Sequence, residues 1–173
     1  MNSPFANIFL AIQQRIQNNV TGINYIDQDL GQLKNDRNTT RPNISFPCVL
    51  IDFEDFNFED IAENAQTANA TIVLRLGLAP FSNSSQVTPT GYIASAISYY
   101  DLEWSLHKAI QGWSPIDDTG YMMRTEVATQ KRNDTIRVRE IRYSLAFEDY
   151  STANNIQRVS EPVHISPQIQ LPL

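Results

Sequence analysis

Hydrophobic residues recur at helical spacing over the first twenty residues of the chain. Ser3 and Pro4 supply a cap and a first-turn proline, and Gly22 follows the last apolar position. The apolar positions are Phe5, Ile8, Phe9, Ile12, Ile16 and Val20. The pattern predicts a helix that begins at Pro4 and ends before Gly22.

Two β-rich segments follow a long polar stretch. Residues 21–45 are rich in turn formers and predict a long loop with a short strand near Tyr25. Residues 46–53 are apolar on both faces, and residues 71–78 alternate between apolar and polar positions, so each predicts a strand. Residues 52–63 lie between the two strands, and we interpret them as a hairpin loop.

The middle of the chain predicts a linker and one long helix. Residues 81–91 are rich in Ser, Thr, Pro and Gly, and Thr90 is a suitable helix cap. Residues 92–113 carry apolar side chains over a wide helical face. We expect the sheet to cover this helix on one side and a neighbouring molecule to cover the other.

The last part of the folded region predicts a hairpin. Residues 119–130 and 134–149 have strand character and are joined by a polar turn at 131–134. In the second strand, Ile136 and Val138 share one parity, whereas Ile141 and Tyr143 share the other. Because a change of parity moves the apolar residues to the opposite face, we expect a bulge between Val138 and Ile141.

These elements predict an α+β fold in a single domain. The expected architecture is a mostly antiparallel sheet of about four strands, packed by two helices in the order α-β-β-α-β-β. The domain should span residues 1–150. Residues 151–173 contain three prolines and no periodicity, so we expect an extended C-terminal arm.

Composition and charge narrow the function classes. Hydrophobic residues make up 42% of the chain and charged residues 18%, as in ordinary folded proteins. The net charge of −6 argues against a surface that neutralises nucleic-acid phosphates and favours protein partners. The single cysteine, Cys48, cannot form an internal disulfide. No apolar run is long enough to span a bilayer and the first residues lack a basic leader, so we expect a soluble protein made inside the cell.

Candidate reactive groups are sparse. The acidic residues 52–63 contain no glycine for the sharp turn of a calcium loop. Glu103 and His107 lie four residues apart on one helical face, and with Asp117 they could form a small enzymatic or ligand-binding site. No third metal ligand has matching spacing, and no glycine-rich phosphate loop is present. We expect no catalysis, no metal and no cofactor.

Charge is distributed unevenly along the chain. Residues 52–63 carry −6, and residues 124–142 carry six basic against three acidic residues, or +3. Either both are ordinary solvated hairpins, or the two segments meet head-to-tail between identical subunits. The residues of this hypothetical subunit interface are Asp52, Glu54, Asp55, Glu59, Asp60, Glu63, Arg124, Lys131, Arg132, Arg137, Arg139 and Arg142.

Four segments give the chain a recognisable likeness: GINYIDQDLGQL, FPCVLIDFEDF, NATIVLRLGL and VREIRYSLAFED. In this order, over residues 4–150, they resemble the tail terminator, or tail completion, proteins of long-tailed bacteriophages and prophages. The resemblance implies a virion protein of the tail neck, assembled in the bacterial cytoplasm. It implies a homo-oligomeric ring, usually a hexamer, that caps the tail tube, ends its polymerisation and joins it to the head connector.

The same resemblance implies where contacts would lie. The partners would be further copies of the chain, the tail tube protein and the head–tail connector protein, with DNA passing through the channel without specific binding. The ring contacts would involve residues 21–45, 52–63 and 124–142, and no active site is implied. The proline-rich arm departs from the family pattern. Another neck or tail-tube component of similar size is an alternative, and polymerisation distinguishes the two, since a tube protein forms long tubes and a terminator stops at one ring.

Overall fold

The computed structural model describes residues 3–34, 44–79, 85–87, 89–117, 119–132, 134 and 136–152. The chain order of its helices and strands is α1 (Pro4–Asn19), β1 (Tyr25–Gln28), β2 (Cys48–Ala62), β3 (Ala65–Leu78), α2 (Thr90–Ile97), α3 (Tyr99–Ile110), β4 (Met123–Gln130) and β5 (Arg137–Asp149). Most of the predicted C-terminal arm, residues 153–173, lies outside the described residues, as do residues 35–43 of the long loop and part of the predicted linker.

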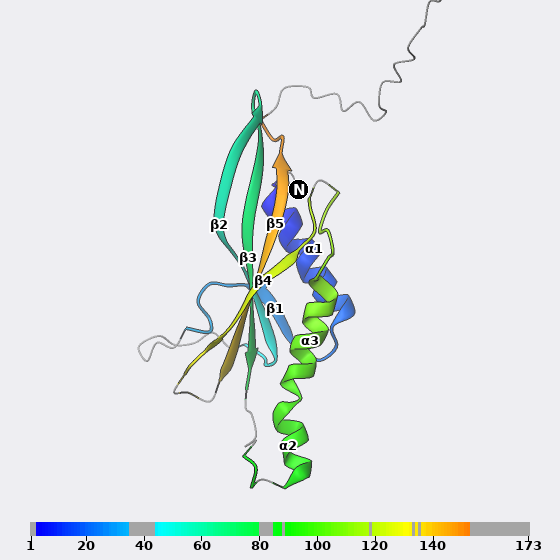
Figure 1. Cartoon of the computed structure of the whole chain (residues 1–173), viewed down its shortest axis with the longest axis vertical. Helices are drawn as coiled ribbons and strands as arrows, with labels where there is room; N and C mark the ends of the chain where they lie inside the picture. Colours follow the sequence, from blue (N-terminus) through cyan, green and yellow to red (C-terminus); the bar gives the residue numbers. More distant parts are fainter. Residues whose placement is uncertain are drawn as a thin grey trace, which may run out of the picture.

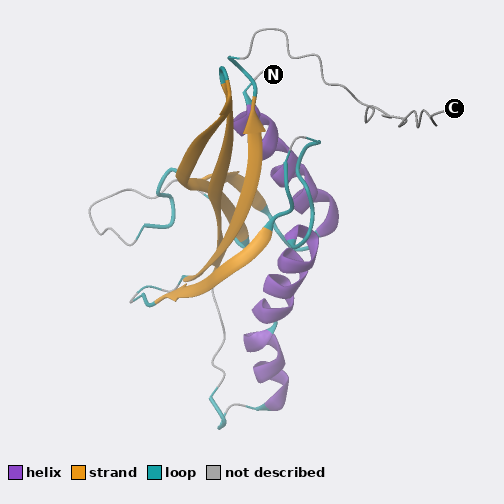
Figure 2. Ribbon diagram, turned by 45° about the horizontal axis from the view of Figure 1, so that its top comes forward, coloured by secondary structure: helices purple, strands orange, loops and turns teal. Residues whose placement is uncertain are grey.

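The strands form one five-stranded sheet in the order β1-β2-β3-β5-β4. The neighbouring pairs are antiparallel except β1 and β2, which are parallel. The helices lie on one side of this twisted sheet (Figure 2). The predicted α+β class is therefore confirmed, with one strand more than the four expected, because the short strand near Tyr25 joins the sheet edge.

The acidic stretch is a strand and not the predicted hairpin loop. β2 continues to Ala62, and Glu63 and Asn64 alone connect it to β3. The interpretation as a loop was wrong because the apolar alternation changes phase inside the stretch. A register shift between Glu54 and Phe56 leaves Asp55 as an extra residue with a positive φ of 23°.

This bulge places the phenylalanines of β2 on one face. Phe53, Phe56 and Phe58 pair with Ile72, Ala70 and Ala68 of β3, which share a single parity. Phe5 of α1 makes edge-on ring contacts with Phe53, Phe56 and Phe147. The aromatic cluster holds the hairpin of β2 and β3 against α1, and the hairpin extends to one end of the long axis of the molecule (Figure 1).

The bulge predicted in β5 is absent, since the pairing of β5 with β3 is continuous from Arg137 to Asp149. The change of parity is real but needs no bulge, because both faces of the sheet bury apolar residues around the start of β5. Ile136 and Val138 join a second small cluster with Leu33, Cys48 and Leu50, on the face opposite the helices. The register shift in this hairpin lies in β4, between Arg124 and Glu126.

The main core lies between the sheet and the helices α1 and α3. Its fully buried members include Ile8, Ile12 and Ile16 of α1, Leu106 and Ile110 of α3, and Ile72, Leu74, Leu76, Ile141 and Tyr143 of the sheet. The predicted first helix is thus confirmed, and its apolar stripe is the buried one. No helix of the described chain is long and apolar enough to cross a membrane.

The predicted long helix is interrupted. A turn at Ser98 separates α2 from α3, and Thr90 is the first residue of α2 instead of its cap. α2 lies end to end with α3 and stands away from the sheet, at the end of the molecule opposite the hairpin of β2 and β3 (Figure 1). The sheet therefore covers α3 but leaves Tyr92 of α2 64% exposed.

Candidate functional site

The helix-free face of the sheet carries a network of ion pairs centred on Arg75. In the register of the sheet, Arg75 of β3 lies between Leu50 of β2 and Glu140 of β5. Its guanidinium contacts Asp29, Asp52 at 2.9 Å, Glu54 at 2.7 Å and Glu140 at 3.5 Å. The network thereby ties the loop after β1 to strands β2, β3 and β5.

Arg142 is the second cation of this network. It pairs with Glu54 at 2.5 Å, with Glu140, and with Glu126 of β4 at 3.5 Å. Five carboxylates therefore face two guanidiniums, and the side chains are largely shielded from water except Glu126, which is 61% exposed. Such partly buried, charge-assisted contacts fix the register of the strands that carry them.

The electrostatics of the network favour its ionised state. Burial disfavours the charge on Arg75, but its hydrogen bonds to Asp52 and Asp29 outweigh this effect, so its pKa is raised. Burial likewise opposes the charge on Glu140, yet the hydrogen bond from Gln130 and the charges of Arg75 and Arg142 lower its pKa. Neither group is poised to exchange protons near neutral pH, so the network is suited to holding strands together and not to acid–base chemistry.

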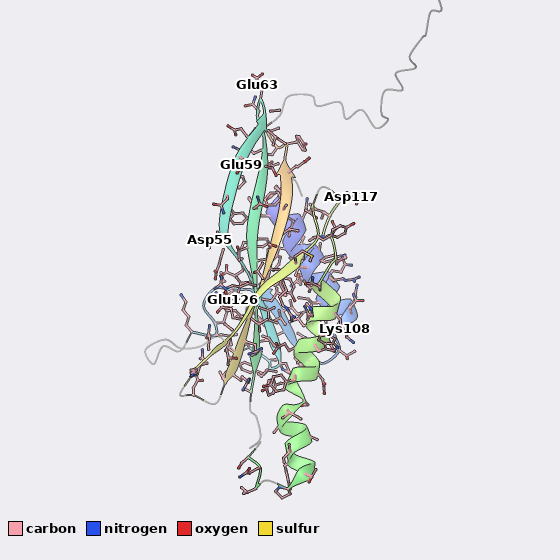
Figure 3. The ribbon with its side chains drawn as sticks, in the orientation of Figure 1. Asp55, Glu59, Glu63, Lys108, Asp117 and Glu126 are labelled. Atoms are coloured by element: carbon pink, nitrogen blue, oxygen red, sulfur yellow. The ribbon has the colours of Figure 1, made fainter. Side chains whose placement is uncertain are left out.

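The residues proposed for an enzymatic site are engaged separately. Both carboxylate oxygens of Glu103 accept hydrogen bonds from Arg139, at 2.7 and 2.8 Å. His107 lies 3.3 Å from the hydroxyl of Tyr143, and burial and the charge of Arg124 lower its pKa. Asp117 is exposed on the loop that follows α3 (Figure 3). Within the described residues, no group of three or more His, Cys, Asp or Glu side chains could hold a metal ion.

The acidic residues predicted at a subunit interface divide into two sets. Asp52 and Glu54 belong to the ion-pair network described above. Asp55, Glu59, Asp60 and Glu63 are exposed along β2 and its turn, which we call the acidic arm (Figure 3). Asp60 accepts a hydrogen bond from Gln66 at 2.8 Å. The acidic arm therefore keeps its charge facing outward, whereas the base of β2 does not.

Most of the predicted basic residues have partners within the chain. Arg132 pairs with Asp134 at 2.7 Å and Arg139 with Glu103, while Arg142 lies in the network. The Arg137 guanidinium stacks on the ring of Tyr99 at 4.1 Å. Arg124 and Lys131 are exposed and form no ion pair among the described residues. The acidic and basic segments are thus partly complementary inside one molecule, where β3 brings them together.

Sequence reasoning missed the centre of the network. Arg75 was treated as one polar position of an alternating strand, and Asp29 as part of a loop. The signal that could have identified Arg75 is its setting: it is the only charged residue among the fourteen of β3. A lone arginine in such a strand requires carboxylate partners from its neighbours.

Several large apolar side chains are exposed on the helices and at the start of β4. They are Tyr92 and Ile97 in α2, Tyr100 and Trp104 in α3, Tyr121 before β4 and Met123 as its first residue. Trp104 is 57% exposed and contacts the ring of His107. Exposed aromatic and methionine side chains of this density are typical of protein contact surfaces.

Comparison with solved structures finds a distant likeness, and two other comparisons find no match. No family model matches the chain, and no curated protein matches it. Among solved structures, the chain is similar to a chain of "Virion of native gene transfer agent (GTA) particle", with a TM-score of 0.48 and 10% sequence identity. The likeness covers 82% of this chain and 94% of that chain. A likeness this distant assigns neither a family nor a function.

Proposed function

We propose that this chain is a structural subunit of a phage or prophage virion, a tail terminator that forms a ring on the end of the tail tube. The ring would end polymerisation of the tube and join the tail to the head connector. The observation that carries the proposal is the presence of two exposed surfaces of unlike chemistry on one fold. One is the acidic arm, and the other is the aromatic surface of α2 and α3.

These two surfaces favour assembly between molecules. The acidic arm lies at one end of the long axis and α2 at the other (Figure 1), so one molecule cannot bring its own two surfaces together. Contacts between unlike surfaces of identical subunits produce rings when the rotation closes. A closed ring offers no free subunit surface for further growth in its plane, which suits a protein that stops a growing tube.

The assignment to a phage tail is supported by the sequence resemblance. The strands that carry it are the same strands that build the sheet, since FPCVLIDFEDF spans the start of β2, NATIVLRLGL lies in β3 and VREIRYSLAFED lies in β5. The proposed partners are further copies of the chain in a hexamer, the tail tube protein and the head–tail connector. The net charge of −6 suits a channel through which DNA passes without binding.

The experiment is a tube-assembly assay with the tail tube protein of the same phage or prophage. Purified tube protein is allowed to polymerise with increasing amounts of the chain, and tube lengths are measured by electron microscopy. We expect shorter tubes, each with a ring at one end. Unchanged tube lengths would contradict the proposal, and long tubes formed by this chain alone would identify it as a tube component.

A further inference from the structure

The acidic arm needs a docking surface other than the basic hairpin. Three of the arginines in that hairpin are already held by carboxylates of the same molecule: Arg132 by Asp134, Arg139 by Glu103 and Arg142 by Glu54. Recruiting them to a second molecule would break ion pairs that are largely shielded from water, which is costly. The acceptor surface should therefore contain cations without such partners.

A surface with this property lies on the helix side of the sheet, between α3 and β4. We call it the α3–β4 strip and define it as Tyr100, Trp104, Met123, Arg124 and Arg137. Gln111, the C-cap residue of α3, holds the first two residues of β4: its Nε2 donates to Met123 Sδ at 3.5 Å, and its Oε1 accepts from the backbone N–H of Arg124 at 2.9 Å. A shallow hollow of about 220 Å³ lies beside it, lined by Glu103, Arg124, Thr125, Glu126, Val127 and Arg139.

The strip and the hollow beside it have a small excess of positive charge, because Arg124, Arg137 and Arg139 lie there against Glu103 and Glu126. Arg124 pairs in the sheet with Tyr143, so both side chains lie on the helix side, whereas Glu126 pairs with Arg142 on the opposite face. Arg124 forms no ion pair among the described residues. Arg137 is stacked on Tyr99, and its buried Nε has no hydrogen-bond partner. Arg124 is exposed and can therefore bind an external carboxylate without losing an internal one, whereas the buried Nε of Arg137 is out of reach of a second molecule.

The aromatic side chains of the strip add contact area. Tyr100 is 52% exposed, Trp104 57% and Met123 49%. Tryptophan, tyrosine and arginine are the residue types that dominate the energy of protein interfaces, and methionine is enriched in them. Basic and aromatic residues together fit a partner that carries carboxylates and apolar side chains on one ridge.

The acidic arm has this composition. Beside its four exposed carboxylates it presents Phe58, 43% exposed, and Ile61, 48% exposed. The arm is the far end of the β2–β3 hairpin, whereas α3 runs beside the opposite half of the molecule (Figure 1), so an arm reaches the strip only in another copy. We propose that the acidic arm of one copy docks on the α3–β4 strip of the next. This inference rests on the self-assembly proposed above and names the two surfaces that meet.

The backbone of the arm favours docking through side chains and not through strand pairing. Beyond Ile51, no described strand pairs with the outer edge of β2. Register shifts between Glu54 and Phe56 and between Asp60 and Ala62 interrupt this edge. Bulges and charges are the features that prevent an edge strand from adding a further strand. The arm is therefore suited to a finite contact and not to open-ended sheet growth.

The test is a reciprocal charge exchange followed by sedimentation equilibrium of the full chain. The arm variant carries Glu59→Lys and Glu63→Lys, and the strip variant carries Arg124→Glu. We expect each variant alone to dissociate with a constant raised roughly tenfold, a shift typical of losing a complementary charge contact. We expect an equimolar mixture of the two to associate again, because each reversed surface then meets a reversed partner.

Two matched controls separate the strip from general effects. Lys131→Glu makes a similar charge change at an exposed site outside the strip and should change the constant less than about twofold. Trp104→Ala should raise it about 30-fold, as for an interface hot spot. Leu10→Ala, on α1 and 45% exposed, should leave it unchanged. Thermal melts confirm that every variant is folded.

The outcomes distinguish this inference from the proposed function. Wild-type protein that stays monomeric over the whole range of concentration and salt would overturn the self-assembly, and the docking with it. Wild-type protein that associates while Arg124→Glu and Trp104→Ala leave association unchanged would overturn the docking alone. Weakened variants that do not recover on mixing would show that the strip binds something other than the acidic arm, which also overturns the inference.

Discussion

Replacing Arg75 by methionine removes the cation on which four carboxylates converge. The variant retains most of the aliphatic volume of the side chain but leaves Asp29, Asp52, Glu54 and Glu140 facing one another. Arg142 remains beside Glu54 and Glu140, so those two keep a partner. The expected result is a large loss of stability at neutral pH, because uncompensated carboxylates are then held close together in a partly shielded site.

The magnitude follows from the exposure of these groups. Breaking a fully buried ion pair costs about 3–5 kcal/mol. The Arg75 side chain is 16% exposed and its carboxylate partners are 8–34% exposed, so water screens part of the effect. We expect a loss of about 2–3 kcal/mol, which corresponds to a melting temperature lower by roughly 5–10 °C for a chain of this size.

The stability deficit of Arg75→Met should become smaller at acidic pH. In the wild type the pKa of Glu140 is lowered, so its ionised form contributes stability that is present above the unfolded pKa of about 4.3 and is lost as pH falls further. In the variant, protonation of the clustered carboxylates relieves their mutual repulsion and stabilises the fold. The deficit relative to wild type should therefore shrink between neutral pH and about pH 4.

The assay is urea unfolding of wild type and Arg75→Met at several pH values, monitored by tryptophan fluorescence. Lys131→Met is the control, because Lys131 is exposed, has no ion pair among the described residues and lies outside the α3–β4 strip. It should change stability by less than about 0.5 kcal/mol. A stable Arg75→Met variant, or a deficit that stays constant on acidification, would refute the reasoning that the network holds the strands.

Two further predictions concern the packing of the sheet and of α3. Gly77→Ala should destabilise the fold by about 1–3 kcal/mol in thermal melts. The added Cβ would lie 2.7 Å from Cys48 Sγ and 3.0 Å from Leu33 Cδ1. An unchanged melting temperature would contradict this, because it would show that Cys48 and Leu33 can move to make room. Glu103→Gln should lower the free energy of unfolding by about 1–2 kcal/mol, because it removes the carboxylate that pairs with Arg139. Asp101→Asn, at an exposed site on the same helix, should change it little. Equal losses in the two variants would contradict a specific role for Glu103.

The regular parts of the fold could be predicted because their periodicity has a single physical cause. Ile8, Ile12 and Ile16 recur every four residues since one face of α1 is buried, and that pattern can be read directly from the sequence. Ile72, Leu74 and Leu76 alternate because β3 has one apolar face against the helices. Such patterns depend only on neighbours along the chain.

The phase of a strand could not be predicted where an extra residue interrupts it. The phenylalanines of β2 fall on one face only because Asp55 is bulged, and without that knowledge FEDFNFED has neither strand nor helix periodicity. The change of parity in β5 has the opposite explanation, a second core on the other face. Both features depend on what the neighbouring strands supply, so they follow from tertiary contacts and not from the local sequence.

The charge of each segment can be counted from the sequence, but the partners of the charged side chains cannot. The opposite signs of residues 52–63 and 124–142 predict attraction, but the sequence alone does not show that β3 brings Glu54 to Arg142 within one molecule. The assignment of all twelve charges to a subunit interface therefore stays a prediction, to be tested first on the exposed residues. Among these are Glu59 and Glu63 on the arm and Arg124 on the strip.

The most direct test of the account is the position of the chain on assembled particles. Gold-labelled antibody against the chain is bound to purified tailed particles from the host, and the label is located by electron microscopy. The account predicts label at a single position, where the tail meets the head. Label spread along the whole tube, or found only on material free of particles, would contradict it.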